Sequence, residues 1–336
     1  MDHKKNKIRI IIILLICICC LSVLFFLFPK IISPFLKHTK ASKLIDSENY
    51  DEAYSILYSL DKEDEVIENK YDRAIQLIRN KDDDSICEAY SLLGEIDFKD
   101  SKTQQENLKP QYKKILRKRA DVGSTFLFGT YEQDNDITDG KEDIDWIVLK
   151  RESDRVLVVS KYILDCVPYT IGKYTIYEQN EFFKEMNDHI SQGETWATCS
   201  LREWVNTDFY NNAFTKDEQE LIIQSAVTAD ENPLYSTDPG AVTKDNVFIL
   251  STSEVNFYLK EDIDKQCIVT PYAISKGVSN YTYDNITYGS WWLRTPGYFN
   301  YFASFISFSG VINNYGSDTF NKYCGVRPAL WISLND

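Results

Sequence analysis

The spacing of hydrophobic positions changes twice along this chain. Residues 10–28 form an apolar run of 19 residues without a charge. Residues 41–120 then place apolar side chains three and four positions apart, which is the period of an amphipathic helix. From residue 121 onward, apolar and polar positions alternate in short segments separated by turns, as in strands. The pattern therefore predicts one transmembrane helix, an all-α segment and a mixed α+β domain.

The first apolar run has the features of an uncleaved signal anchor. Its length is close to the ~20 residues that a helix needs to cross the hydrocarbon core. The basic residues of the tail, residues 1–9, favour a cytoplasmic N-terminus. The run continues through Phe28 into Pro29 and Lys30 without the small residues of a cleavage site. The sequence thus predicts a single-pass membrane protein, held in the lipid bilayer through residues 10–28, with an extracellular C-terminal domain.

The helical segment contains a short internal repeat. The hexapeptide Glu52–Leu57 returns with conservative changes as Glu88–Leu93, at an offset of 36 residues. A period of this length is typical of helix-pair repeats, and the segment resembles tetratricopeptide repeats. We expect residues 41–120 to form a stalk of helical hairpins that acts as a spacer. A groove that recruits protein partners is the alternative function of such repeats.

The C-terminal domain, residues 121–336, opens with three predicted antiparallel strands at residues 125–131, 144–149 and 156–159. Capping-box patterns predict helices that start at Ser200, Thr215 and Ser251. A further strand is expected at residues 247–250, and turn residues predict hairpins near the C-terminus. These elements predict an α+β domain with long loops.

Two apolar motifs near the C-terminus each contain one arginine: Gly289–Gly297 contains Arg294, and Gly325–Ile332 contains Arg327. A buried guanidinium needs partners for its donors, so both arginines are predicted to be structural. With these motifs, residues 121–336 resemble an uncharacterised bacterial family of domains of unknown function. They are more remotely similar to the C-type-lectin-like fold of formylglycine-generating enzymes. The resemblance implies a C-type-lectin-like domain with antiparallel strands.

Charge and composition exclude several functions. Residues 121–336 carry 16 basic and 32 acidic side chains, so binding of nucleic acid is excluded. Only His38 and His189 lie outside the N-terminal tail, which argues against a histidine-based zinc site or catalytic triad. Buried free thiols are the favoured interpretation of the domain's cysteines, although four cysteines also allow three disulfide pairings. These cysteines are Cys166, Cys199, Cys267 and Cys324.

Two groups of side chains are candidates for binding. Asp134, Asp136 and Asp139 offer hard oxygen ligands within one loop, but their spacing does not match a calcium-binding loop, so we expect a solvated loop without a metal. Trp196, Trp291 and Trp292 offer rings on which a ligand stacks. Packing in the core is the alternative role of these tryptophans.

The combined features predict a non-enzymatic surface protein with a lectin-like module that binds an extracellular glycan or protein. No catalytic residue and no cofactor are predicted. One alternative is a cysteine- or carboxylate-dependent enzyme related to formylglycine-generating enzymes. The other is a scaffold that recruits proteins through the helical repeats.

Overall fold

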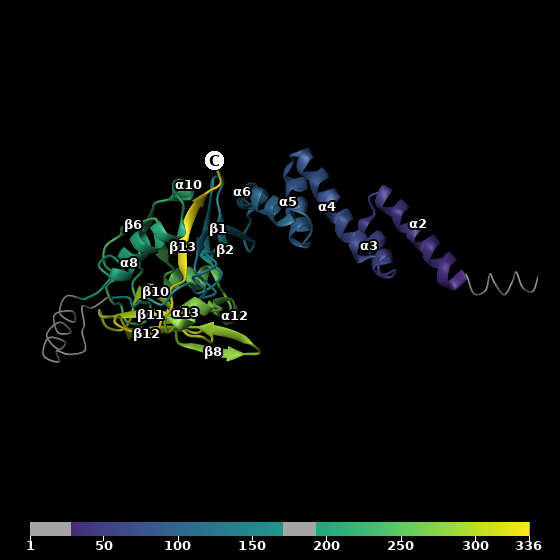
Figure 1. Cartoon of the computed structure of the whole chain (residues 1–336). Coiled ribbons are helices and arrows are strands. Elements are labelled where there is room, and N and C mark those ends of the chain that lie inside the picture. Colours follow the sequence, from purple (N-terminus) through teal and green to yellow (C-terminus); the bar gives the residue numbers. More distant parts are fainter. Residues whose placement is uncertain (1–27, 171–192, 336) are drawn as a thin grey trace, which may run out of the picture. The chain divides into compact units, whose positions relative to one another are not determined.

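The computed structural model describes residues 28–170 and 193–335, and the chain divides into two compact units after Tyr112 (Figure 1). The sequence placed this division after Ala120. Helix α6 (Ser101–Arg119) continues through the boundary, and its last turns belong to the second unit. There Lys113 pairs with Asp143, while Arg117 donates to main-chain carbonyls of Ser333 and Asn335.

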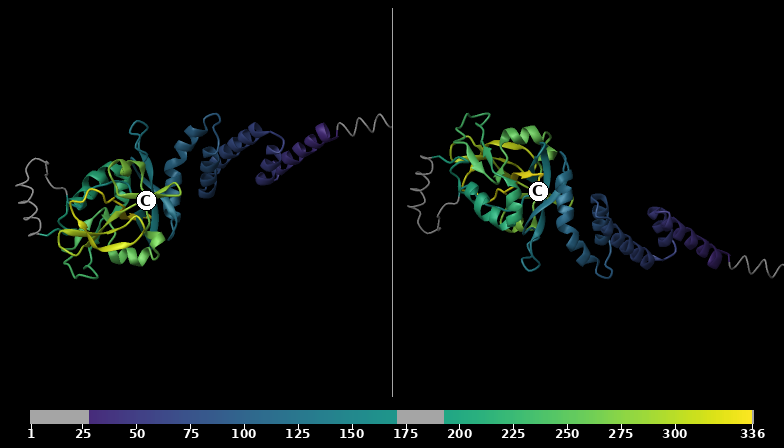
Figure 2. Two further views of the ribbon diagram at one scale, coloured as in Figure 1. Left: turned by 90° about the horizontal axis from the view of Figure 1, so that it is seen from below. Right: turned by 90° about the horizontal axis from the view of Figure 1, so that it is seen from above.

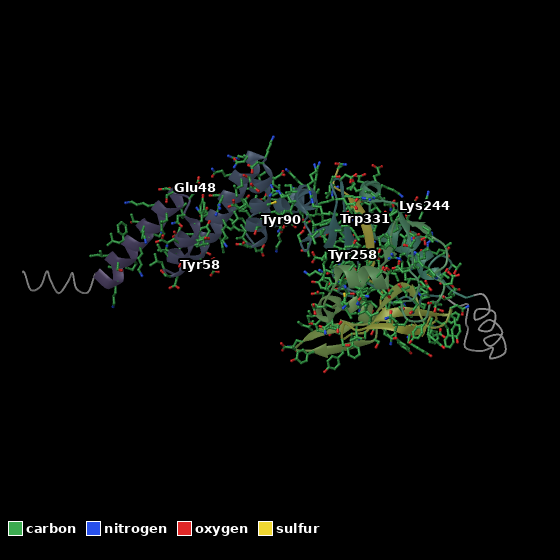
Figure 3. All side chains as sticks on the ribbon, turned by 180° about the vertical axis from the view of Figure 1, so that it is seen from behind. Glu48, Tyr58, Tyr90, Lys244, Tyr258 and Trp331 are labelled. Atoms are coloured by element: carbon green, nitrogen blue, oxygen red, sulfur yellow. The ribbon has the colours of Figure 1, made fainter. Side chains whose placement is uncertain are left out.

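From residue 28 onward, the described part of the N-terminal unit contains helices and no strand. It comprises η1 (Phe28–Ile32), α2 (Ser33–Asp46), α3 (Tyr50–Tyr58), α4 (Glu63–Asn80), α5 (Asp83–Gly94) and the first part of α6. The two copies of the repeated hexapeptide lie on α3 and α5, each at the start of a helix pair. Asp82 caps α5 by accepting a hydrogen bond from the Ser85 N–H at 2.9 Å. Tyr90, labelled in Figure 3, comes from α5 and stacks on Tyr112 with ring centroids 4.0 Å apart.

The structure corrects the membrane prediction. Within residues 28–170 and 193–335, no helix is both long and apolar enough to cross a bilayer. Helix α2 has only 14 residues and carries Lys37, Lys40 and Lys43. The predicted anchor, residues 10–28, lies outside the described residues except for Phe28. We therefore do not retain the transmembrane helix in the fold class, nor the single-pass membrane localisation.

The C-terminal unit is built on a six-stranded sheet. Its strand order is β1 (Thr125–Tyr131), β2 (Glu142–Arg151), β3 (Arg155–Ser160), β13 (Pro328–Ser333) and β4 (Ile222–Ile223), and β7 (Phe248–Ile249) also pairs with β13. The antiparallel pairing of β1, β2 and β3 confirms the predicted meander. Strand β13 pairs with β3, β4 and β7 and so joins the last two strands to the meander.

A second, three-stranded sheet lies below the first in Figure 1 and consists of β10 (Trp291–Pro296), β11 (Phe302–Ile306) and β12 (Ile312–Asp318). Two small hairpins complete the strands: β5 (Ser225–Val227) with β6 (Thr243–Asp245), and β8 (Asn280–Tyr283) with β9 (Ile286–Gly289). The β8–β9 hairpin extends from the body of the unit (Figure 1).

Short helices surround these strands, as both views of Figure 2 show. The capping boxes at Thr215 and Ser251 are confirmed. Each hydroxyl accepts from the backbone N–H of the third helical residue, Glu218 or Glu254, and the side chain of that glutamate accepts from the backbone N–H of the capping residue. The cap predicted at Ser200 is wrong by one residue, because the Cys199 sulfur accepts from the Arg202 N–H instead. The helices are α8 (Ser200–Trp204), η2 (Val205–Phe209), α9 (Tyr210–Ala213), α10 (Lys216–Leu221), α11 (Thr252–Tyr258), α12 (Asp262–Lys265) and α13 (Pro271–Ser275).

Candidate functional site

Arg294, from the first motif, ties the three-stranded sheet to helix α11. Its side chain is buried, and its Nη1 and Nη2 donate to the two carboxylate oxygens of Glu254 at 2.6 and 2.7 Å. Its remaining donors reach the carbonyl oxygens of Ile249 and Thr228. Glu254 is also the glutamate of the capping box at Ser251. One carboxylate therefore caps a helix and neutralises a buried guanidinium.

Arg327, from the second motif, lies in the core at the start of β13. Its Nε donates to the Ser160 carbonyl at 2.9 Å, and its guanidinium lies 5.0 Å from the centroid of the Trp291 ring. Its Nη1 has no hydrogen-bond partner among the described residues. The side chain is 1% exposed, so it faces no ligand at the surface.

The three candidate tryptophans are core residues. Trp196, Trp291 and Trp292 are at most 1% exposed. Each indole N–H donates within the protein: Trp196 to Asp245, Trp291 to the Lys265 carbonyl and Trp292 to the Val167 carbonyl. Their ring faces are covered by the protein, so the structure does not present them to a ligand.

An exposed aromatic surface lies instead around β11, β12 and the turn that precedes β11. Four of its six rings are 38–48% exposed. Tyr298 and Tyr315 stack with centroids 5.2 Å apart and planes within 8°. The rings of this group, here called the aromatic platform, are those of Tyr235, Tyr298, Phe299, Tyr301, Phe302 and Tyr315.

Two glycines allow the backbone to hold this platform. A Cβ on Gly316, whose φ is +84°, would lie 2.7 Å from the Ala303 carbonyl oxygen, and a Cβ on Gly297 would lie 2.6 Å from that of Tyr315. The two segments therefore approach more closely than side chains permit. Asn232 joins them, because its side-chain amide donates to the carbonyls of Pro296 and Asn314 at 2.7 and 2.8 Å.

The family is assigned by a match over the C-terminal unit. The model of the family described as Domain of unknown function (DUF6273) matches residues 153–334, more than half of the chain. The chain belongs to the DUF6273 family. No curated protein and no solved structure matches it, so the predicted likeness to C-type-lectin-like folds, formylglycine-generating enzymes and tetratricopeptide repeats receives no support. The fold class is corrected to a mixed helix-and-strand unit preceded by a helical unit.

The match to DUF6273 begins just before β3, although β1 and β2 are hydrogen-bonded into the same sheet.

The loop between β1 and β2 contains several carboxylates that lie close together. Oxygens of Glu132, Asp134 and Glu142 lie within 4.8 Å of one another, and among the predicted candidates only Asp134 belongs to this group. Asp136 instead accepts from the Thr138 hydroxyl at 2.6 Å. Desolvation and the charges of three neighbouring carboxylates raise the pKa of the exposed Asp139.

The cysteines of the DUF6273 unit are free thiols in the part of the chain that the structure describes. Burial raises the pKa of both Cys166 and Cys199 to about 12. Burial also raises the pKa of Cys324 and Cys267. A thiol with such a pKa is protonated at neutral pH and is a poor nucleophile, so the thiol chemistry considered from the sequence has no activated cysteine here.

A pocket of about 450 Å³ contains an acidic group that the sequence did not indicate. Asp165 is 6% exposed, and its Oδ2 accepts from the Tyr131 hydroxyl at 2.5 Å while its Oδ1 accepts from the Cys166 N–H at 2.6 Å. Burial raises the pKa of Asp165, although these two hydrogen bonds and the charge of Lys276 oppose the rise. Burial and the neighbouring Asp165 also raise the pKa of Tyr131, which therefore remains a donor.

Relative to the wild type, the Asp165→Asn variant is expected to gain unfolding free energy as the pH rises. A carboxyl whose pKa is higher in the folded state contributes stability below its unfolded pKa of about 3.9, and this contribution is lost as the pH rises through the folded pKa. Asparagine does not titrate. Urea unfolding between about pH 3 and pH 7 should therefore show a difference in unfolding free energy, variant minus wild type, that increases with pH.

Tyr131→Phe provides the matched variant for this test, because it keeps the buried carboxyl and removes its hydroxyl donor. Loss of a hydrogen bond to the charged form raises the carboxyl pKa further, so stability should fall more steeply with pH than in the wild type. If the unfolding free energy of Asp165→Asn minus that of the wild type is constant or decreases with pH, the raised pKa of Asp165 in the folded state is contradicted.

Proposed function

We propose that the C-terminal unit is a non-catalytic, lectin-like module that binds a neutral carbohydrate on the aromatic platform. The observation that carries the proposal is the group of six contacting rings, four of them well exposed on one surface. Exposed apolar side chains that gather in one patch are typical of interaction sites. The C–H face of a sugar ring packs well on an aromatic face, which combines apolar area with a polar edge.

Polar groups on the platform support a polyhydroxylated ligand. The hydroxyls of Tyr235, Tyr298 and Tyr315 have no hydrogen-bond partner among the described residues, so they are available to a ligand or water. The acidic balance of residues 121–336 disfavours an anionic ligand. A neutral sugar chain meets both conditions, and burial raises the pKa of the Cys166 and Cys199 thiols, which disfavours a thiol-dependent reaction at these residues.

The test is binding of the full chain to an array of neutral and acidic glycans and cell-wall fragments. We expect saturable binding to neutral glycans that Tyr298→Ala weakens by roughly tenfold, equivalent to about 1.4 kcal/mol. Tyr281→Ala is the matched control, because Tyr281 is 54% exposed on β8 and lies outside the platform. Folded protein that binds no glycan, or equal losses in both variants, would overturn the proposal.

A further inference from the structure

The pocket around Asp165 is separate from the aromatic platform and has its own chemistry. Strand β1, the segment after β3, helices η2 and α9, and helix α13 all contribute to its lining. Its volume of about 450 Å³ lies within the range of about 300–1,000 Å³ that is typical of small-molecule sites. The pocket is therefore large enough for a small organic molecule.

Acidic and basic side chains both line this pocket. Asp165 accepts a hydrogen bond at each carboxylate oxygen, and each oxygen retains further acceptor capacity. Asp208, on η2, adds a second carboxylate that is exposed. Lys276 follows α13 and supplies an ammonium group, which lies 5.0 Å from the centroid of the Tyr272 ring. A ligand with only one charge would meet a like charge in this space.

Aromatic side chains complete the wall. Tyr131 and Tyr272 meet edge to face, with centroids 6.0 Å apart, and Trp204 packs against Phe209. Trp204 is only partly buried and lines the pocket. Such a wall favours an apolar or aromatic substituent between the charged groups.

We propose that this pocket binds a free α-amino acid, with its ammonium group on Asp165 and Asp208 and its carboxylate on Lys276. The two acids and the lysine match the two charges of the zwitterion, and charge-assisted hydrogen bonds give the required selectivity. Trp204 and Tyr272 then contact the amino-acid side chain. Binding is reversible and involves no covalent step.

Calorimetric titration of the full chain with related probes tests this assignment. L-Phenylalanine, phenethylamine and 3-phenylpropionate share one ring, but only the first carries both charges; L-leucine and L-serine test the side-chain requirement. We expect L-phenylalanine to bind at least about tenfold more tightly than either singly charged analogue. Equal binding of phenethylamine would overturn the role of Lys276, and absence of binding by all three amino acids would overturn the proposal.

Substitutions test which residue binds each charged group of the amino acid. Asp165→Asn and Lys276→Met should each weaken binding of L-phenylalanine by about tenfold or more. Glu203→Gln and Lys244→Met are the matched controls, since both residues line a different pocket, and Lys244 is labelled in Figure 3. Unchanged tryptophan fluorescence establishes that each variant is folded. Unchanged binding of L-phenylalanine by Asp165→Asn, or an equal loss of binding in the control variants, would contradict the proposed amino-acid site. The aromatic platform is tested separately with glycans.

Discussion

Glu254→Ala is expected to lower the unfolding free energy of the C-terminal unit by about 3–5 kcal/mol, because it leaves the buried guanidinium of Arg294 without its carboxylate. Arg294 is 3% exposed and would lose the acceptor of both terminal nitrogens, so its charge would remain buried with only carbonyl partners. The variant also loses the capping box of α11. Urea unfolding followed by tryptophan fluorescence measures this, because all six tryptophans lie after residue 120.

Glu218→Ala is the matched control for Glu254→Ala. Glu218 occupies the same position in the capping box of α10, and its other oxygen accepts only from the Gly129 N–H among the described residues. No arginine depends on it, so we expect a loss of about 1 kcal/mol. Equal losses in the two variants would show that the capping box, and not the pair with Arg294, determines the effect.

Trp292→Ala should destabilise the same unit by about 3–5 kcal/mol, as large-to-small changes at buried aromatic residues do. Trp292 is 0% exposed, donates its indole N–H to the Val167 carbonyl and meets Tyr169 edge to face at 5.7 Å. The substitution leaves a cavity and an unpaired carbonyl. Thermal and urea unfolding measure the loss.

Trp331→Ala is the comparison for Trp292→Ala. The Trp331 ring (Figure 3) lies on β13 beside Arg155 and Lys150, at 4.5 and 5.6 Å, and is only partly buried. Cation–π contacts at such sites contribute about 0.5–1 kcal/mol each, so the loss should be smaller than at Trp292. A larger loss at Trp331 would contradict the assignment of Trp292 to the core.

Local patterns predicted the local elements. The alternation in residues 125–159 predicted the β1–β2–β3 meander, because each strand pairs with its neighbour in sequence. The boxes at Thr215 and Ser251 predicted helix starts, because the cap is formed within four residues. The cap at Cys199 was missed because sulfur is an uncommon acceptor at this position.

The candidate sites depend on contacts between distant segments, which the local patterns did not reveal. Tyr235 contacts Tyr298 and Tyr315, which lie more than 60 positions further along the chain, and Asn232 links its loop to β10 and β12. Asp165 was not a candidate because its partner Tyr131 lies 34 positions away. The tryptophans were considered for ligand stacking because a sequence does not distinguish a ring in the core from a ring at the surface.

The position of β13 has a consequence for how the chain folds during synthesis. This strand follows every other described strand in the sequence, yet it pairs with β3, β4 and β7. A ribosome therefore exposes β3 with one edge unpaired until β13 emerges. In that interval the free edge of β3 is a template for pairing with another chain, so aggregation competes with folding of the nascent domain.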